Sequence, residues 1–294
     1  MWVLLASLIV QGAAEAGHAE AAPLEPLGRF EAGMIPEASG VVKSRRYPGI
    51  FWVHNDSGNA PVLFAVLSDG RIVRRFRLAI PNLDWEDIAI DDQGHLYLGD
   101  IGNNIVPLKV RTIYRIDEPD PSLPEDKDRD RPLAATRTVS YMLPRSNRFD
   151  AESLVYDHGT AILIAKYVDG REAELFTVPI DPAPKGAGQG AAPVRPIGKL
   201  PGFKEPATGA DLSEDGTLLA VCSYAVTRVY RRGKADAWDL MAEVRHAPLP
   251  IEGIAWDGRD LILAAEEARG LYRLREAAWS ERRTNHDGAR SKAK

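Results

Sequence analysis

The chain has 294 residues, of which 45% are hydrophobic and 27% charged, so it can bury a full core and is not a disordered polymer. Its formal net charge of −5 gives no electrostatic case for a nucleic-acid partner or an anionic membrane surface. The single cysteine, Cys222, excludes an intramolecular disulfide and a cysteine-based zinc cluster.

The first segment, residues 2–10, is an apolar run too short to span a bilayer, and an Ala-rich and Gly-rich stretch follows it. This order is typical of a secretory signal, so residues 1–22 are predicted to be a signal peptide and the protein to be secreted or periplasmic. Neither Lys nor Arg precedes the run, so an ordinary buried N-terminus is the alternative. No later run is long enough for a membrane helix.

Five degenerate hairpins recur along the rest of the chain. The clearest has an apolar run at 86–90, a polar turn at 91–94 and a second run at 95–99. The five copies begin at Glu37, Glu86, Glu152, Thr208 and Glu252, with spacings of 49, 66, 56 and 44 residues. Such spacings are typical of four-stranded propeller blades with loops of varying length.

Each of the first four units is expected to hold four strands. In chain order these are 37–42, 49–54, 62–67 and 71–78; 86–91, 95–100, 111–116 and 136–143; 152–156, 161–167, 173–179 and 193–200; and 208–213, 217–224, 227–231 and 240–246. The turn-forming segments 118–132 and 182–192 lengthen loops and do not mark domain boundaries.

The fifth unit supplies only three strands, at 254–256, 260–265 and 270–274. A closed ring cannot leave that blade with an exposed outer edge, so the early run at 27–32 is expected to be its fourth strand. The sequence therefore predicts an all-β, five-bladed β-propeller over residues 23–276, closed by an N-terminal strand, with a disordered tail at 277–294. A six-bladed propeller, made by splitting the long second unit, is the alternative.

The residue that opens each innermost strand should face the axis, so four glutamates are expected to converge there. Packed carboxylates repel one another and lose solvent, which raises their pKa values unless a cation compensates. Many oxygen ligands from separate blades favour Ca²⁺ over zinc or copper; the alternative is that the glutamates bond backbone amides of neighbouring blades. The expected metal ligands are Glu37, Ser39, Glu86, Glu152, Thr208 and Glu252.

The second strand of each unit returns to the same face, so its end and the following loop should add polar residues there. Together these residues could bind a small polar ligand or a protein surface, although Asn-Asp-Ser-Gly and Gly-Asn-Asn are also ordinary turn sequences. The expected ligand-binding residues are His54, Asn55, Asp56, Asp100, Asn103, Lys166, Tyr167, Tyr224 and Glu266.

The aligned hairpins resemble the soluble calcium-activated nucleotidase (apyrase) family, over roughly residues 36 to 265. The segments that carry the resemblance are Trp85-Glu86-Asp-Ile-Ala, Ala151-Glu152-Ser, Ala207-Thr208-Gly and Ile251-Glu252-Gly-Ile-Ala. The resemblance implies a five-bladed propeller with one calcium ion in the axial tunnel, held by residues that open the inner strands. The chain departs at Glu37, where the family has a hydroxyl residue, and it lacks the family's long insertions.

The chain is equally similar to exported bacterial propellers that carry Trp-Val-His-Asn-Asp-Ser-Gly and Trp-Glu-Asp-Ile-Ala segments, and that resemblance implies a fold and no activity. Two functions follow. The preferred one is a monomeric calcium-binding propeller that binds a ligand or acts as a scaffold, since no unmistakable general base or hydrolase motif is present. The alternative is a calcium-dependent hydrolase of phosphate or lactone esters.

Overall fold

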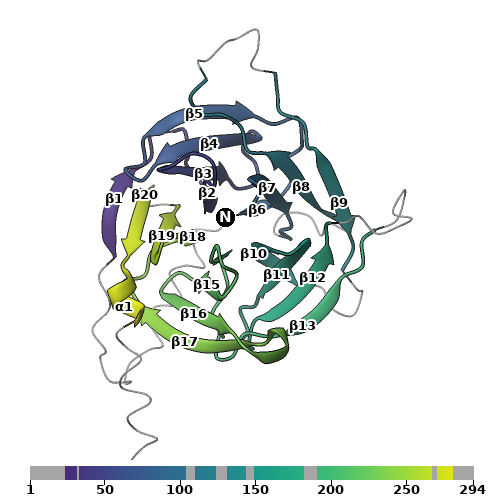
Figure 1. Cartoon of the computed structure of the whole chain (residues 1–294), viewed down its shortest axis with the longest axis vertical. Helices are drawn as coiled ribbons and strands as arrows, with labels where there is room; N and C mark the ends of the chain where they lie inside the picture. The colour runs from purple at the N-terminus through teal and green to yellow at the C-terminus, as the bar shows by residue number, and fades with distance from the viewer. Residues whose placement is uncertain are drawn as a thin grey trace, which may run out of the picture.

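Five four-stranded antiparallel sheets form a ring around a central axis (Figure 1). The computed structural model describes residues 24–31, 33–103, 110–123, 131–143, 149–181, 191–266 and 270–280. The chain is therefore the predicted all-β, five-bladed β-propeller. The six-bladed alternative is wrong, because the long second unit forms one sheet.

The first four blades each use four successive strands, ordered from the axis outward. They are β2 (Ala38–Lys43), β3 (Ile50–Asn55), β4 (Val62–Leu67) and β5 (Ile72–Arg77) in blade 1; β6 (Trp85–Ile90), β7 (His95–Asp100), β8 (Arg111–Asp117) and β9 (Arg137–Tyr141) in blade 2; β10 (Asp150–Asp157), β11 (Thr160–Lys166), β12 (Glu174–Pro179) and β13 (Arg195–Lys199) in blade 3; and β14 (Gly209–Leu212), β15 (Leu218–Cys222), β16 (Val226–Arg232) and β17 (Trp238–Arg245) in blade 4. A 3₁₀ helix (Lys234–Asp236) precedes β17.

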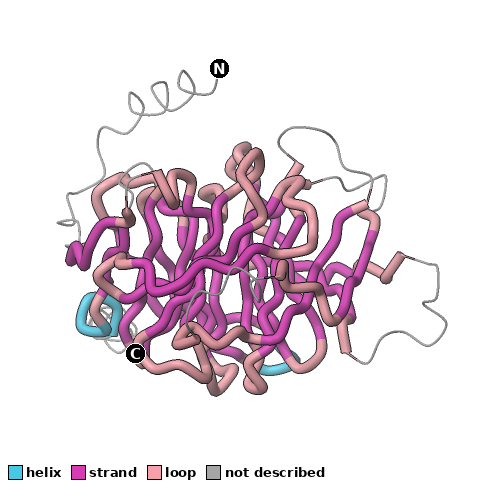
Figure 2. The backbone as a smooth tube through the Cα atoms, turned by 90° about the horizontal axis from the view of Figure 1, so that it is seen from above, coloured by secondary structure: helices cyan, strands magenta, loops and turns pink. Residues whose placement is uncertain are grey.

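Blade 5 combines both ends of the chain. It holds β18 (Ile251–Asp257), β19 (Asp260–Ala265) and β20 (Gly270–Leu274), with β1 (Glu25–Arg29) as its outermost strand. β1 pairs antiparallel with β20, which confirms the expected closure of the ring by an N-terminal strand. Seen from the side, the strands form a band between two loop-covered faces (Figure 2).

The hydrophobic core lies between adjacent blades because the inner strands are buried on both sides. Every residue of β3 and β6 is buried, whereas every residue of the outer strand β13 is exposed. Trp52 of blade 1 and Ile88 of blade 2 belong to one apolar cluster, as expected when twisted sheets pack face to face.

Helix α1 (Glu276–Ser280) follows the last blade and contacts β17 of blade 4. Trp279 is fully buried and lies edge-on to Trp256, with ring centroids 5.7 Å apart. The predicted end of the folded domain at residue 276 is therefore corrected to at least Ser280, because burial of the Trp279 side chain holds this helix against the ring.

The predicted signal peptide and residues 281–294 of the predicted tail lie outside the described residues. Among the residues that are described, no helix has the length and apolar character needed to cross a membrane.

Candidate cation site at the axial face

β-bulges place glutamates at the start of three innermost strands. In β6, Trp85 and Asp87 pair with consecutive residues of β7, so Glu86 between them is an extra residue. Glu152 of β10 and Glu252 of β18 are the extra residues of equivalent bulges. A bulge redirects a side chain out of the regular pleat, and these three glutamates are all buried or nearly so.

The register places Ser39, and not Glu37, at the corresponding position of blade 1. The bulge of β2 covers Ser39 and Gly40. Glu37 lies two residues earlier, is exposed, and accepts a hydrogen bond from Asn59. The expected start of the first unit at Glu37 is thus corrected by two residues, because the pairing of β2 with β3 decides which residue bulges.

The two predicted hydroxyl ligands link neighbouring blades. Ser39 Oγ donates to the Glu86 carbonyl oxygen at 2.6 Å, and Thr208 Oγ1 donates to the Ile251 carbonyl oxygen at 2.7 Å. Each hydroxyl donates its hydrogen in this bond, but its oxygen keeps lone pairs that can coordinate a cation.

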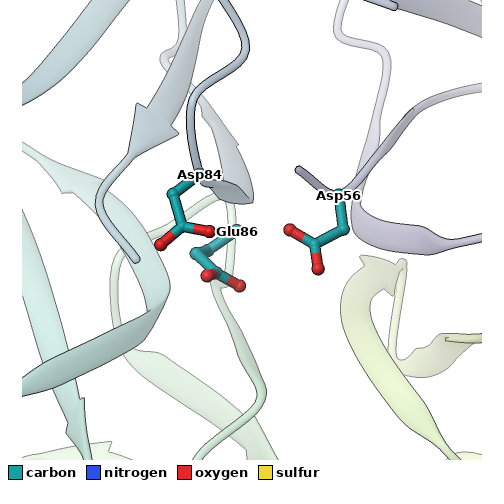
Figure 3. Close-up of side chains that lie close together, drawn as sticks. All are labelled: Asp56, Asp84 and Glu86. Atoms are coloured by element: carbon teal, nitrogen blue, oxygen red, sulfur yellow. The ribbon is translucent and has the colours of Figure 1, made fainter. Parts of the chain in front are cut away.

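Three carboxylates from two blades meet at the axial face. Asp56 follows β3, and Asp84 and Glu86 lie at the start of β6; Figure 3 shows the side chain of Asp56 facing the other two. One carboxylate oxygen from each lies within 4.8 Å of the others. Hard oxygen ligands at this spacing suit a Ca²⁺ ion.

Backbone and side-chain contacts hold this cluster in place. Asn82 Nδ2 donates to the Asp56 carbonyl oxygen at 2.9 Å, while Asn82 Oδ1 accepts from the Trp85 amide at 3.2 Å. Gly102 packs directly on the cluster, since a β-carbon there would lie 1.9 Å from Glu86 Oε1. Only glycine fits so close to a carboxylate.

Burial and mutual repulsion both act on these carboxylates. Burial, followed by the charges of Glu152 and Asp56, raises the pKa of Glu86 well above its usual range. Burial also raises the pKa of Asp56 to about 7, although a backbone hydrogen bond from Ser57 opposes it. A bound cation would relieve this cost by favouring the charged form.

Blade 3 carries an ammonium group at the opening. Lys166, the last residue of β11, forms an ion pair with Glu152 Oε1, and its Nζ lies 5.8 Å from the centre of the Tyr224 ring. Burial alone would lower the pKa of Lys166, but the charges of Glu152, Tyr224 and Glu252 outweigh burial and raise it. Lys166 therefore remains protonated.

The predicted ligand-binding residues divide into two groups. Asp56, Lys166, Tyr224 and Glu266 lie at the axial opening, since their charges act on one another or on the bulge glutamates. The other five have different surroundings. His54 is fully buried beside Trp85, Asn55 donates to the Met34 carbonyl oxygen, Asp100 accepts from the Asp84 amide at 2.7 Å, Tyr167 donates to Glu174 at 2.8 Å, and Asn103 is half-buried after β7.

Sequence reasoning missed Asp84 and Asp150 as members of the opening. Both stand two residues before a bulge glutamate, and both raise the pKa of Glu86 by their charge. This shared spacing was the available signal. It brings the aspartate and the glutamate to the same opening only because the strand bulges at the glutamate.

A second layer of inner-strand residues lies below the bulge residues. In blade 2 this residue is Asp87, which is fully buried. Its Oδ2 accepts from the Leu154 amide at 2.9 Å and from the Ala210 amide at 3.3 Å, so one carboxylate joins blades 2, 3 and 4. The other members of this layer are small: Gly40, Ser153, Gly209 and Gly253.

Comparisons with known proteins give only distant structural similarities. No protein-family model matches the chain, and no curated protein matches it. A crystal structure of a nidogen/laminin complex matches with 9% sequence identity and a TM-score of 0.45, covering 86% of this chain and 88% of that one. The β-propeller domain of Myceliophteria thermophila Cps50 (Swd1) matches with 12% identity and a TM-score of 0.40, covering 83% of this chain and 65% of that one.

Proposed function

We propose that this chain is a secreted or periplasmic propeller that binds calcium at its axial face and uses the surrounding polar residues as a ligand-binding or scaffolding surface. The observation that carries the proposal is the approach of Asp56, Asp84 and Glu86 oxygens to within 4.8 Å of one another. Buried like charges at this spacing are costly without a counterion.

A second, independent observation supports a cation. Glu152 Oε2 is buried and has no hydrogen-bond partner among the described residues. Glu152 is also the largest charged influence on the pKa of Glu86, so its carboxylate lies beside the cluster. A buried carboxylate oxygen without a donor is expected to find a ligand, because such an atom otherwise forfeits its hydration.

Calcium titration of chelator-treated protein tests the proposal. We expect Ca²⁺ to bind by calorimetry and to raise the melting temperature, because it binds the folded state only. Glu86→Gln should abolish both responses, since it removes a central charged ligand while keeping its shape.

Glu214→Gln is the matched control, because it makes the same chemical change at an exposed residue in the turn between β14 and β15. Its response to calcium should equal that of the wild type. If neither chelator nor calcium changes the melting temperature of the wild type, the calcium proposal is wrong.

One observation favours hydrolysis as the second candidate. Asp56, Asp84 and Glu86 supply only part of the roughly six to eight oxygen ligands that Ca²⁺ takes, and Asp56 is only half-buried. Water would complete the shell of a bound ion, and metal-bound water is a potential nucleophile near neutral pH. Turnover of p-nitrophenyl phosphate or a simple lactone that requires Ca²⁺ and is lost in Asp56→Asn would establish the enzyme; calcium binding without turnover favours the binding module.

A further inference from the structure

Lys166 occupies a distinct position in the axial opening. It ends β11, where Asp150 is its partner across the strand pair, and its side chain is 15% exposed. Its ammonium group forms an ion pair with Glu152 Oε1 and lies over the Tyr224 ring. A cation held between a carboxylate and an aromatic face is already well satisfied.

The charges around the opening are distributed unevenly. The largest charged influences on Glu86 are all carboxylates, namely Glu152, Asp56, Asp150 and Asp84. Glu252, in contrast, has Lys166 among its strongest influences, and the effect of Lys166 on Glu252 opposes that of Glu152. The ammonium therefore compensates Glu152 and Glu252, and it is not among the main charged influences on Glu86 or Asp56.

Glu152 interacts with both Lys166 and Glu86. Its Oε1 accepts from Lys166, while its buried Oε2 finds no hydrogen-bond donor in the part of the chain that the structure describes. A carboxylate with one oxygen on an ammonium and one oxygen available can bridge that ammonium to a metal ion.

We propose that Lys166 is a built-in countercation that determines where calcium binds, holding a single ion off the axis on Asp56, Asp84 and Glu86 with Glu152 as the bridge. The inference rests on the proposed calcium site and specifies its geometry and stoichiometry. The ammonium is paired with Glu152 and its charge acts on Glu252, so it repels any divalent ion that approaches them.

Lys166→Met tests the inference, because it removes the charge and keeps most of the apolar stem. Calcium bound per chain is measured by equilibrium dialysis with elemental analysis, and affinity by calorimetry. We expect the variant to bind a second ion, or to bind one ion about tenfold or more tightly, since a repelling charge is removed from the opening.

Two control variants separate this effect from a general change in charge. Lys166→Arg keeps the cation and should bind calcium as the wild type does. Lys199→Met removes a half-exposed lysine that pairs with Glu174 at 3.4 Å, on the outer strand of the same blade, and should also leave binding unchanged.

The outcomes distinguish this inference from the calcium proposal itself. One ion in the wild type with unchanged affinity and stoichiometry in Lys166→Met overturns the role of Lys166 alone. Binding only in the variant supports Lys166 as the resident cation and overturns calcium binding by the natural protein, whereas no binding by either overturns both. If Lys166→Met folds only when calcium is present, the ion has replaced the ammonium, which supports the inference.

Discussion

Two aspartates of the innermost strands use their carboxylates in a different way from the bulge glutamates. Asp87 accepts from the amides of Leu154 and Ala210, and Asp211 Oδ2 accepts from the Trp256 amide at 2.8 Å. These bonds satisfy buried carboxylates with the backbone of neighbouring blades. The structural role that the sequence left open for the glutamates thus belongs to these aspartates.

Asp211 gives a pH-dependent prediction. Burial raises its pKa to about 7, although the Trp256 amide and the charge of Arg45 lower it. The unfolded value is about 3.9, so between about pH 4 and pH 7 the folded chain holds a proton that the unfolded chain has released. The stability from this group is complete below that range and is lost as the pH rises through it.

Asp211→Asn should remove this contribution. We expect the free energy of unfolding to decline less with rising pH in the variant than in the wild type, with a difference of about 1.4 kcal/mol per unit of pKa shift at most. Urea unfolding across that range measures it. The exposed Asp239→Asn is the control, and equal slopes in wild type and Asp211→Asn would show that Asp211 titrates normally.

At the scale of strands and turns, the repeat pattern predicted the blades because alternating apolar runs and polar turns act locally. The bulges were not predictable in the same way. Glu37 and Ser39 both fit the repeat in the amino-acid sequence, and only the hydrogen-bond register of β2 with β3 shows which of them occupies the bulge. The approach of Asp56 to Asp84 likewise depends on the relative orientation of two neighbouring blades. The sequence of a single repeat does not determine that orientation.

The closing strand β1 gives the element-scale prediction. A β-carbon on Gly28 would lie 1.9 Å from the Asp69 carbonyl oxygen in the turn of blade 1. Gly28→Ala must therefore push β1 away from that turn, and we expect the free energy of unfolding to fall by about 1–3 kcal/mol. Chemical denaturation measures the loss.

Gly33→Ala is the appropriate control because its backbone φ is +79° and a β-carbon there meets nothing within 4 Å. It should cost only the strain of a left-handed conformation, about 1 kcal/mol. If Gly28→Ala loses no more stability than this control, β1 and the turn of blade 1 can move apart at no measurable cost, and the prediction is wrong.

At the scale of the whole ring, the pairing of β1 with β20 joins the two ends of the chain and covers the edge of blade 5. Deleting residues 1–29 would expose that edge along the length of β20. Exposed edges pair with other chains, so we expect the truncated protein to self-associate and to melt at a lower temperature. Light scattering after size exclusion measures the association.

Deleting residues 281–294 is the control truncation, because it leaves every described strand pairing in place. That variant should remain at the size of the full chain. A monomeric protein of unchanged melting temperature after removal of β1 would mean that the ring holds together without its closing strand.

The Asp87 carboxylate, which joins three blades below the opening, has a consequence for how the opening keeps its shape. It is fully buried and accepts hydrogen bonds from the Leu154 and Ala210 amides. Sliding blade 3 or blade 4 past blade 2 would break one of these bonds where water cannot replace it. The spacing of the glutamates above it is therefore set before any ligand arrives at the axial face.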